Sequence, residues 1–258
     1  MKEKLFNLWL ALRYDWVKQS EKIFRGELVY WAFEFKDYAP LHIVDKEFYN
    51  NNDVWFSKEM IGCDAVNNLV IKCVKNPKER TSWQGTRFVN WESGCIQTDP
   101  LINYGVWEVR AKVPKGWPAI WLLREKHINS DGIETITPEV DIMEVILGKF
   151  QHTIHYKPTK ERYSTDGNNN RIPYDNEFHV FTVDLRKDGY DFYIDRKLTA
   201  RFRNGKDSVS DARCYLVINN AVNKHYEPTE STELVIDYIT VRKNEFTTLD
   251  INSKPWKK

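Results

Sequence analysis

Apolar and polar residues alternate with a period of two along most of the chain beyond residue 23. Residues 106–113 (VWEVRAKV) place an apolar side chain at every second position. Because the side chains of a strand point alternately to its two faces, this pattern is typical of an antiparallel sheet with one covered face. Similar short runs predict about a dozen strands and almost no helix. The expected strands are residues 27–35, 69–74, 94–98, 104–113, 119–123, 139–147, 152–156, 179–185, 190–194, 198–203, 214–222 and 233–242.

The order of these strands predicts an all-β fold. No βαβ alternation, repeat or linker interrupts the series, and Asp188-Gly189 is a hairpin signal between two of the runs. We therefore expect a single β-sandwich of antiparallel sheets over residues 23–244, followed by a C-terminal tail at 245–258. The longest polar insertions are expected to be loops at the rim of a binding face. They are residues 124–138, 157–176 and 223–231.

The first 22 residues have helical periodicity instead. Their large apolar residues fall on one stripe, formed by Leu5, Leu8, Trp9, Leu12 and Trp16. We expect an amphipathic helical arm at 1–22 that packs on the domain or meets a protein partner. The apolar start resembles an export signal, but it is short and lacks a small-x-small cleavage site, so the location of the protein stays unassigned. No run approaches the roughly 20 apolar residues of a membrane span.

Composition narrows the class of function. Lys and Arg (38) balance Asp and Glu (37) to a formal charge of +1, so the overall attraction to nucleic acid is weak. Aromatic residues make up 14% of the chain, with 10 Trp, and we expect some of these rings to line a surface groove. The cysteines show no CxxC pair or short metal-ligand spacing, which predicts free, buried thiols and neither a metal nor a cofactor. They are Cys63, Cys73, Cys95 and Cys214.

Three carboxylates interrupt an otherwise apolar strand at residues 138–146 (PEVDIMEVI). Acids in such a strand are costly unless they face a cleft. In a regular strand Glu139 and Asp141 share a face and Glu144 points to the other, whereas a one-residue β-bulge around Ile142-Met143 brings all three together. Crowded carboxyls raise one another's pKa and provide a proton donor. An exposed acidic edge strand is the alternative, which the apolar flanking residues disfavour.

The spacing ExDxxE occurs within an ordered set of further motifs. YGVWEVRAKVP (104–114) and WPAIWLL (117–123) precede it, and residues 152–156, 178–198, 215–222 and 234–242 follow it. Over roughly residues 65–243 this set resembles glycoside hydrolase family 16. The resemblance implies a β-jelly-roll of two curved sheets with a concave substrate cleft, and endo-hydrolysis of β-linked polysaccharides with retention. The bulged spacing is similar to that of laminarinases, agarases and carrageenases, which favours a β-1,3-glucan or galactan-like substrate.

The resemblance also implies catalytic roles. By motif position Glu139 would be the nucleophile, Glu144 the general acid/base, and Asp141 the residue that tunes the pair. Two sites depart from the family pattern: a turn that is usually Asp-Gly is Asp195-Arg196 here, and an expected Gly pair at the cleft rim is Asn223-Lys224. On this mechanism the two glutamate carboxyls would lie roughly 5–5.5 Å apart.

Five further residues are candidates for sugar contacts: Trp91, Trp117, Trp121, His155 and Asn219. Indole rings offer flat apolar faces and an N–H group, and the alternative for each is a place in the core. His152 and His155 are three apart and so point to opposite faces of a strand, which argues against a shared metal site. His155 would reach a sugar or the nucleophile, or be a structural histidine. Asn219 is a polar break in an apolar strand, with the same two alternatives.

The expected function is therefore an endo-acting retaining glycoside hydrolase that acts on a β-linked polysaccharide. A non-catalytic carbohydrate-binding or structural module is one alternative, although such a module has no need to bury three adjacent acids. A transglycosylase is another, because it shares the covalent intermediate and differs only in the acceptor.

Overall fold

The computed structural model describes residues 27–32, 41–48, 53–129, 132–159, 162–203, 210–222 and 228–243. The expected helical arm (1–22) and C-terminal tail (245–258) lie outside these ranges, so the predicted domain boundaries stay predictions. Among the described residues, no helix has the length and apolar character needed to cross a membrane.

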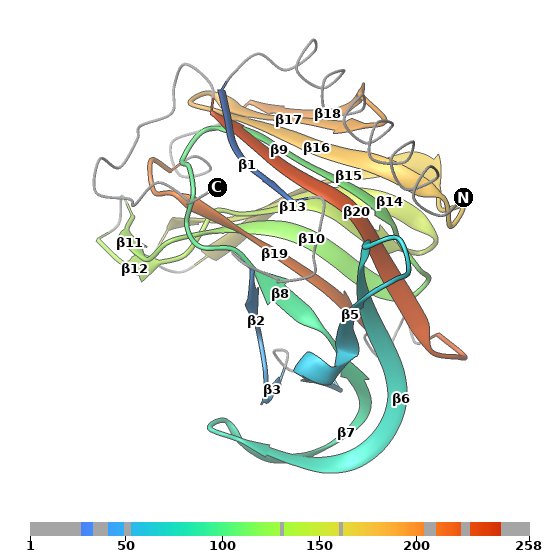
Figure 1. Ribbon diagram of the computed structural model, residues 1–258. Coiled ribbons are helices and arrows are strands. Elements are labelled where there is room, and N and C mark those ends of the chain that lie inside the picture. The colour runs from blue at the N-terminus through green and yellow to red at the C-terminus, as the bar shows by residue number, and fades with distance from the viewer. Residues whose placement is uncertain are drawn as a thin grey trace.

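Two large β-sheets stack as the layers of a sandwich (Figure 1). The larger sheet contains β1 (Glu27–Ala32), β3 (Glu47–Phe48), β4 (Val54–Phe56), β5 (Ile61–Cys63), β6 (Leu69–Ser82), β7 (Gly85–Ser93), β9 (Gly105–Lys112), β16 (Phe178–Arg186), β17 (Gly189–Ile194), β18 (Lys197–Arg203) and β20 (Thr232–Lys243). The smaller sheet contains β2 (His42–Ile43), β8 (Cys95–Gln97), β10 (Trp117–Arg124), β13 (Glu139–Ile146), β14 (Lys149–Thr159), β15 (Arg162–Pro173) and β19 (Cys214–Ala221). The short strands β11 (His127–Ile128) and β12 (Glu134–Thr135) pair separately.

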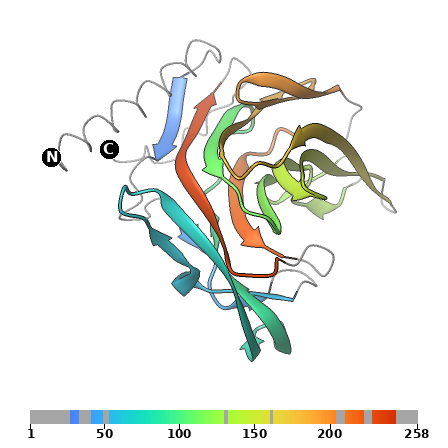
Figure 2. The same ribbon diagram turned by 90° about the vertical axis from the view of Figure 1, so that its right-hand side faces the viewer.

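The order of strands explains where the site can form. The larger sheet runs β18-β17-β16-β9-β20-β6-β7-β4-β3, with β1 beside β20 and β5 beside β6, and the smaller one runs β15-β14-β13-β10-β19-β8-β2. The acidic strand β13 thus lies inside the smaller sheet, between β10 and β14. The β6–β7 hairpin extends beyond the body of the sandwich in both views (Figure 2). An acidic edge strand, the alternative considered above, is excluded.

The main core lies between the two sheets and follows from the alternation in the sequence. In β9, Trp107 and Val109 are fully buried in this core, and the intervening Glu108 lies on the other face of the strand. In β10 and β13, Ile120 and Val140 face the same core from the smaller sheet. Each sheet therefore has one apolar inner face, and the polar residues of β13 are left on the face turned away from the main core.

The all-β sandwich is confirmed, and so is the hairpin at Asp188-Gly189, where Arg186 pairs with Gly189. The prediction of a loop over residues 157–176 is wrong, because β15 pairs with β14 as an edge strand. Its sequence, RYSTDGNNNRIP, has no apolar alternation to reveal a strand. The pairing of β4 with β7 is parallel, unlike the expected antiparallel sheets.

The cysteines correct one further expectation. All four are free, and Cys73, Cys95 and Cys214 are buried as predicted. Cys63 is exposed, because it ends the short strand β5, which pairs only with β6.

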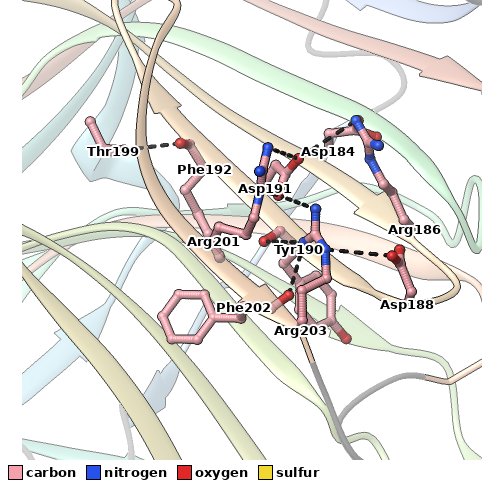
Figure 3. A network of polar contacts seen from close by, with 10 residues as sticks. All are labelled: Asp184, Arg186, Asp188, Tyr190, Asp191, Phe192, Thr199, Arg201, Phe202 and Arg203. Atoms are coloured by element: carbon pink, nitrogen blue, oxygen red, sulfur yellow. Dashed lines mark hydrogen bonds and ion pairs between the residues drawn. The ribbon is translucent and has the colours of Figure 1, made fainter.

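A charge network joins the strands at one edge of the larger sheet (Figure 3). The carboxylate of Asp191 is fully buried and accepts hydrogen bonds from Arg201, while Arg203 Nη2 lies 2.7 Å from its Oδ1. Burial alone would raise the pKa of Asp191, but the two guanidinium groups lower it below its ordinary value. Arg186 bridges Asp184 and Asp191. The network fastens β16, β17 and β18 to one another.

Candidate active site

A β-bulge in β13 brings the three acids together. Toward β14, Asp141 pairs with Thr153 and Glu144 with Gln151, so that Ile142 and Met143 together oppose the single residue between them. Toward β10, Trp121 pairs with Asp141 and Ile120 with Met143. Ile142 is therefore the inserted residue, and the predicted bulge is confirmed.

The bulge determines which face each side chain of β13 occupies. Val140, Ile142 and Met143 are fully buried in the main core. Glu139, Asp141 and Glu144 consequently share the other face, which we call the catalytic face. Their surroundings differ: the Glu139 side chain is 35% exposed, whereas Asp141 and Glu144 are 4% and 8% exposed. Of the three, Glu139 is the most accessible from solvent.

Two hydrogen bonds hold the carboxyl of Glu144. The indole Nε1 of Trp117 donates to its Oε1 over 2.9 Å, and the hydroxyl of Thr153 donates to its Oε2 over 3.3 Å. The carboxyl of Asp141 is also close enough to Glu144 for each group to affect the pKa of the other. Trp117 therefore orients a carboxyl group in addition to any contact with sugar, and Thr153 is a site residue that the sequence analysis did not identify.

His155 lies beside the other two acids, as its position on the neighbouring strand predicted. Its Nε2 is 3.0 Å from Asp141 Oδ2 and 4.0 Å from Glu139 Oε1. The side chain is 37% exposed, so it borders both the carboxyls and the solvent. His152 points to the opposite face and is fully buried, which confirms the expected opposition of the two histidines.

The three acids resist ionisation. Burial raises the pKa of Glu139, and the charge of Glu144 raises it further, against the opposing effect of His155. The pKa of Asp141 lies well above its ordinary value because of burial and the two neighbouring glutamates. Burial raises the pKa of Glu144, against the hydrogen bonds from Trp117 and Thr153. Asp141, whose pKa is raised most clearly, is therefore the acid of the three that most readily keeps a proton, and it does so beside Glu144.

Two of the five candidate sugar contacts need correction. Trp91 is fully buried in a second cluster with Val54, Phe56 and Trp121 on the catalytic face, so its ring offers no surface to a sugar. Asn219 is also fully buried, and its side-chain oxygen accepts a hydrogen bond from the backbone of Ala221. Residues of β4 and β7 cover this end of the face, which the local sequence does not reveal.

The remaining candidates differ in accessibility. Trp117 is half-buried, whereas Trp121 is only 7% exposed and pairs with Asp141 across the sheet. Tyr215 was not considered from the sequence. It is half-buried on β19, where burial raises the pKa of its phenol and the charge of Glu139 raises it further. The sequence could have indicated this position, because Tyr215, Val217 and Asn219 are each two residues apart and therefore share one face of the strand.

One group on this face has the spacing of metal ligands. Ligand atoms of Glu139, Asp141 and His155 lie within 4.8 Å of one another. The sequence analysis expected no metal because the cysteines lack ligand spacing and because His152 and His155 point to opposite faces of a strand. It did not consider this group. Oxygen and imidazole ligands suit a first-row divalent ion. The resemblance to glycoside hydrolase family 16 implies a different role for the same carboxyls, as acids of a hydrolytic site.

Two glutamates and a third acid lie together on one bulged strand of the sandwich. This arrangement is typical of glycoside hydrolases that work with two carboxylates. The family model for glycosyl hydrolases family 16 matches residues 48–240. The chain belongs to glycosyl hydrolase family 16.

Individual relatives agree with this assignment. The chain is 27% identical over 188 residues to a glucan endo-1,3-beta-glucosidase A1 of Niallia circulans. The aligned region covers 62% of this chain but only 27% of that protein. It is 26% identical to a beta-glucanase of Rhodothermus marinus, over 86% of this chain and 87% of the relative. The catalytic domain of an endo-1,3-beta-glucanase (laminarinase) from Thermotoga petrophila has the same fold, with a TM-score of 0.67 and 23% identity over 86% of this chain and all of that one.

Proposed function

We propose that this protein is an endo-acting retaining glycoside hydrolase that cleaves β-1,3-glucan by double displacement. The single observation that carries the proposal is the bulge at Ile142, which places Glu144 on the face of Glu139. Membership of family 16 supports hydrolysis, and the names of the relatives from Niallia circulans and Rhodothermus marinus favour a β-glucan. A galactan-like substrate is the alternative.

In the first step the carboxylate of Glu139 attacks the anomeric carbon of the bound sugar. The glycosidic bond breaks, and the leaving oxygen takes a proton from Glu144, so that a glycosyl-enzyme ester forms. In the second step Glu144, now a carboxylate, removes a proton from water as the water attacks the same carbon. The ester bond breaks, Glu139 is released as a carboxylate, and the configuration is retained.

The surroundings of each acid support these roles. Glu139 is the most exposed of the three, and His155 favours its charged form. Glu144 shares a proton with Asp141, whose pKa lies well above the ordinary value. The pair therefore keeps one proton available for the leaving group while Glu139 is ionised. Trp117 and Thr153 fix the direction of the Glu144 carboxyl.

The test is reducing-sugar release from a panel of β-1,3-glucan, mixed-linkage glucan, agarose, porphyran and carrageenans. We expect the greatest release from β-1,3-glucan. Glu139→Gln keeps the shape of the side chain and removes the nucleophile, so it should abolish turnover while the circular dichroism spectrum stays unchanged. More than a few per cent of residual activity in this variant would contradict the assignment of Glu139.

The panel also separates the two other candidate functions. A binding or structural module would retain glucan without releasing reducing ends, and Glu139→Gln would then change nothing. A transglycosylase would form products longer than the starting oligosaccharide, because a sugar replaces water as the acceptor in the second step.

A protein partner for the N-terminal arm is a further proposal, and it rests on the sequence alone. The apolar stripe that includes Leu5, Trp9 and Trp16 must be covered by the domain or by another molecule. Deleting residues 1–20 should lower either the melting temperature, if the domain covers the stripe, or the mass measured by light scattering, if a second molecule does. An unchanged mass and melting temperature would refute both.

A further inference from the structure

His152 is the residue of β14 that faces the bulge directly. Thr153 pairs with Asp141 and Gln151 with Glu144, so His152 stands opposite Ile142 and Met143. Its side chain points into the main core and is fully buried. The catalytic face lies on the other side of the sheet, so His152 does not reach a bound sugar.

The imidazole bonds to the inserted residue itself. Nδ1 of His152 lies 2.6 Å from the backbone oxygen of Ile142, and Nε2 lies 2.8 Å from the hydroxyl of Thr199 on β18. The ring also stacks on Phe192 of β17, with centroids 4.6 Å apart. β17 and β18 belong to the larger sheet, so this one side chain ties the bulge to the opposite layer of the sandwich.

The partners determine which nitrogen carries the proton. A carbonyl oxygen only accepts, so Nδ1 must donate to Ile142. Burial lowers the pKa of His152 to about 4, and the neutral ring therefore accepts at Nε2 from the hydroxyl of Thr199. The same hydroxyl lies 3.0 Å from the carbonyl oxygen of Phe192 (Figure 3), so its single proton is shared between that oxygen and Nε2. The carbonyl of Ile142 thus fixes the tautomer, and β17 and β18 fix the direction of the ring.

We propose that His152 is a positioning residue, which acts on catalysis by holding the bulge at Ile142 and so keeps Glu144 beside Glu139 and Asp141. The inference rests on the proposed function. Without the imidazole donor, the buried carbonyl of Ile142 loses a partner, and the strand gains by relaxing toward regular pairing. Regular pairing turns Glu144 away from the catalytic face.

Three variants and a control test the proposal. His152→Asn keeps an N–H donor at the position of Nδ1, whereas His152→Gln places its amide near Nε2, and His152→Leu removes both bonds at similar volume. Ile154→Ala is the control, because Ile154 is buried on the same strand and face but pairs with Val140, outside the bulge. It separates general loss of stability from loss of positioning.

The kinetic measurement compares β-1,3-glucan with an aryl β-glucoside whose leaving group needs no protonation. Misplacing Glu144 should lower kcat on the polysaccharide about 100-fold in His152→Leu and His152→Gln, with KM little changed. The aryl substrate should be affected much less. His152→Asn should restore most of the activity. Equal losses on both substrates, or losses no larger than in Ile154→Ala, would overturn the proposal.

A second measurement does not depend on activity. The indole N–H of Trp117 donates to Glu144, so its resonance in a ¹⁵N-labelled protein, assigned with Trp117→Phe, reports the position of that carboxyl. The resonance should move in His152→Leu and His152→Gln and stay in His152→Asn and Ile154→Ala. An unmoved resonance in the first two contradicts the role of His152, even if wild-type protein proves inactive on every glycan. If His152→Leu does not fold, the Asn and Gln variants decide the question.

Discussion

Individual residues of the site were predictable to the extent that their chemistry is local. The ExDxxE spacing was enough to identify three acids and to require a bulge, and His155 followed from its strand. Trp91 and Asn219 were not predictable in the same way. Trp91, on β7, is buried by residues of β4, β10 and β19 that are distant in sequence and meet it only after folding. Asn219 is fully buried on β19, between β10 and β8. Exposure of a single side chain is a tertiary property that alternation does not specify.

The effect of removing the general acid on activity should depend on the leaving group of the substrate. Glu144→Ala is expected to lose nearly all turnover of β-1,3-glucan, because the departing sugar oxygen needs a proton. An aryl glucoside with an activated leaving group should still form the glycosyl-enzyme, and added azide should restore turnover by attacking it. The measurement is the rate with and without azide. Absence of rescue would assign the acid to another residue.

The shared proton predicts a change in the pH profile of Asp141→Asn. Asp141 holds a proton beside Glu144, and its own pKa lies well above the ordinary value. An amide at this position cannot supply that proton, so Glu144 should lose its acid form at lower pH. The alkaline limb of kcat/KM should therefore move to lower pH, with kcat reduced. A limb at the wild-type pH would show that Asp141 does not share the proton.

At the scale of elements, most strands were predicted and the exceptions have physical reasons. Strands with one apolar face, such as β9 and β16, display the period of two. The edge strand β15 is mostly polar and lacks that pattern. The turn at Asp195-Arg196 is more informative: both residues have positive φ, at 50° and 64°, where the family resemblance led us to expect glycine at the second position.

Arg196→Gly should stabilise the protein for this reason. A non-glycine residue at positive φ is unfavourable by about 1 kcal/mol, and glycine is preferred at the second position of such a hairpin turn. The melting temperature should rise. Lys187→Gly is the matched control, since Lys187 is in the preceding hairpin turn and is not among the described residues with positive φ. Equal shifts in the two variants would show that backbone conformation is not the cause.

At the scale of the whole molecule, the sandwich holds three neighbouring acids in a buried arrangement that lowers the stability of the folded chain. Three acids with raised pKa values bind protons more tightly in the folded chain than in the unfolded one. Linkage then makes them destabilising above their unfolded pKa values, and the penalty disappears as the pH falls below those values. The fold class could be predicted from the strand pattern. The loss of stability caused by the three acids could not, because it depends on burial that only the stacked sheets create.

Replacing Asp141 should therefore stabilise the fold. Asp141→Asn is expected to raise the melting temperature at pH 8, and the gain should shrink as the pH falls below the ordinary aspartate pKa of 3.8, where wild-type Asp141 is protonated in both states. Asp175→Asn is the control with the opposite sign, because a hydrogen bond from His179 lowers the pKa of Asp175. That variant should lose stability at pH 8. A pH-independent effect of Asp141→Asn would contradict the linkage.

The central claim is that the bulge makes Glu139 and Glu144 a nucleophile and acid pair on one face of β13. Such a pair acts through a glycosyl-enzyme and retains the β configuration, because no water fits between the nucleophile and the anomeric carbon. Proton NMR of β-1,3-glucan, recorded within the first turnovers and before mutarotation, shows the anomer of the new reducing end directly. We predict that the β-anomer forms first. An initial α-anomer would contradict the account.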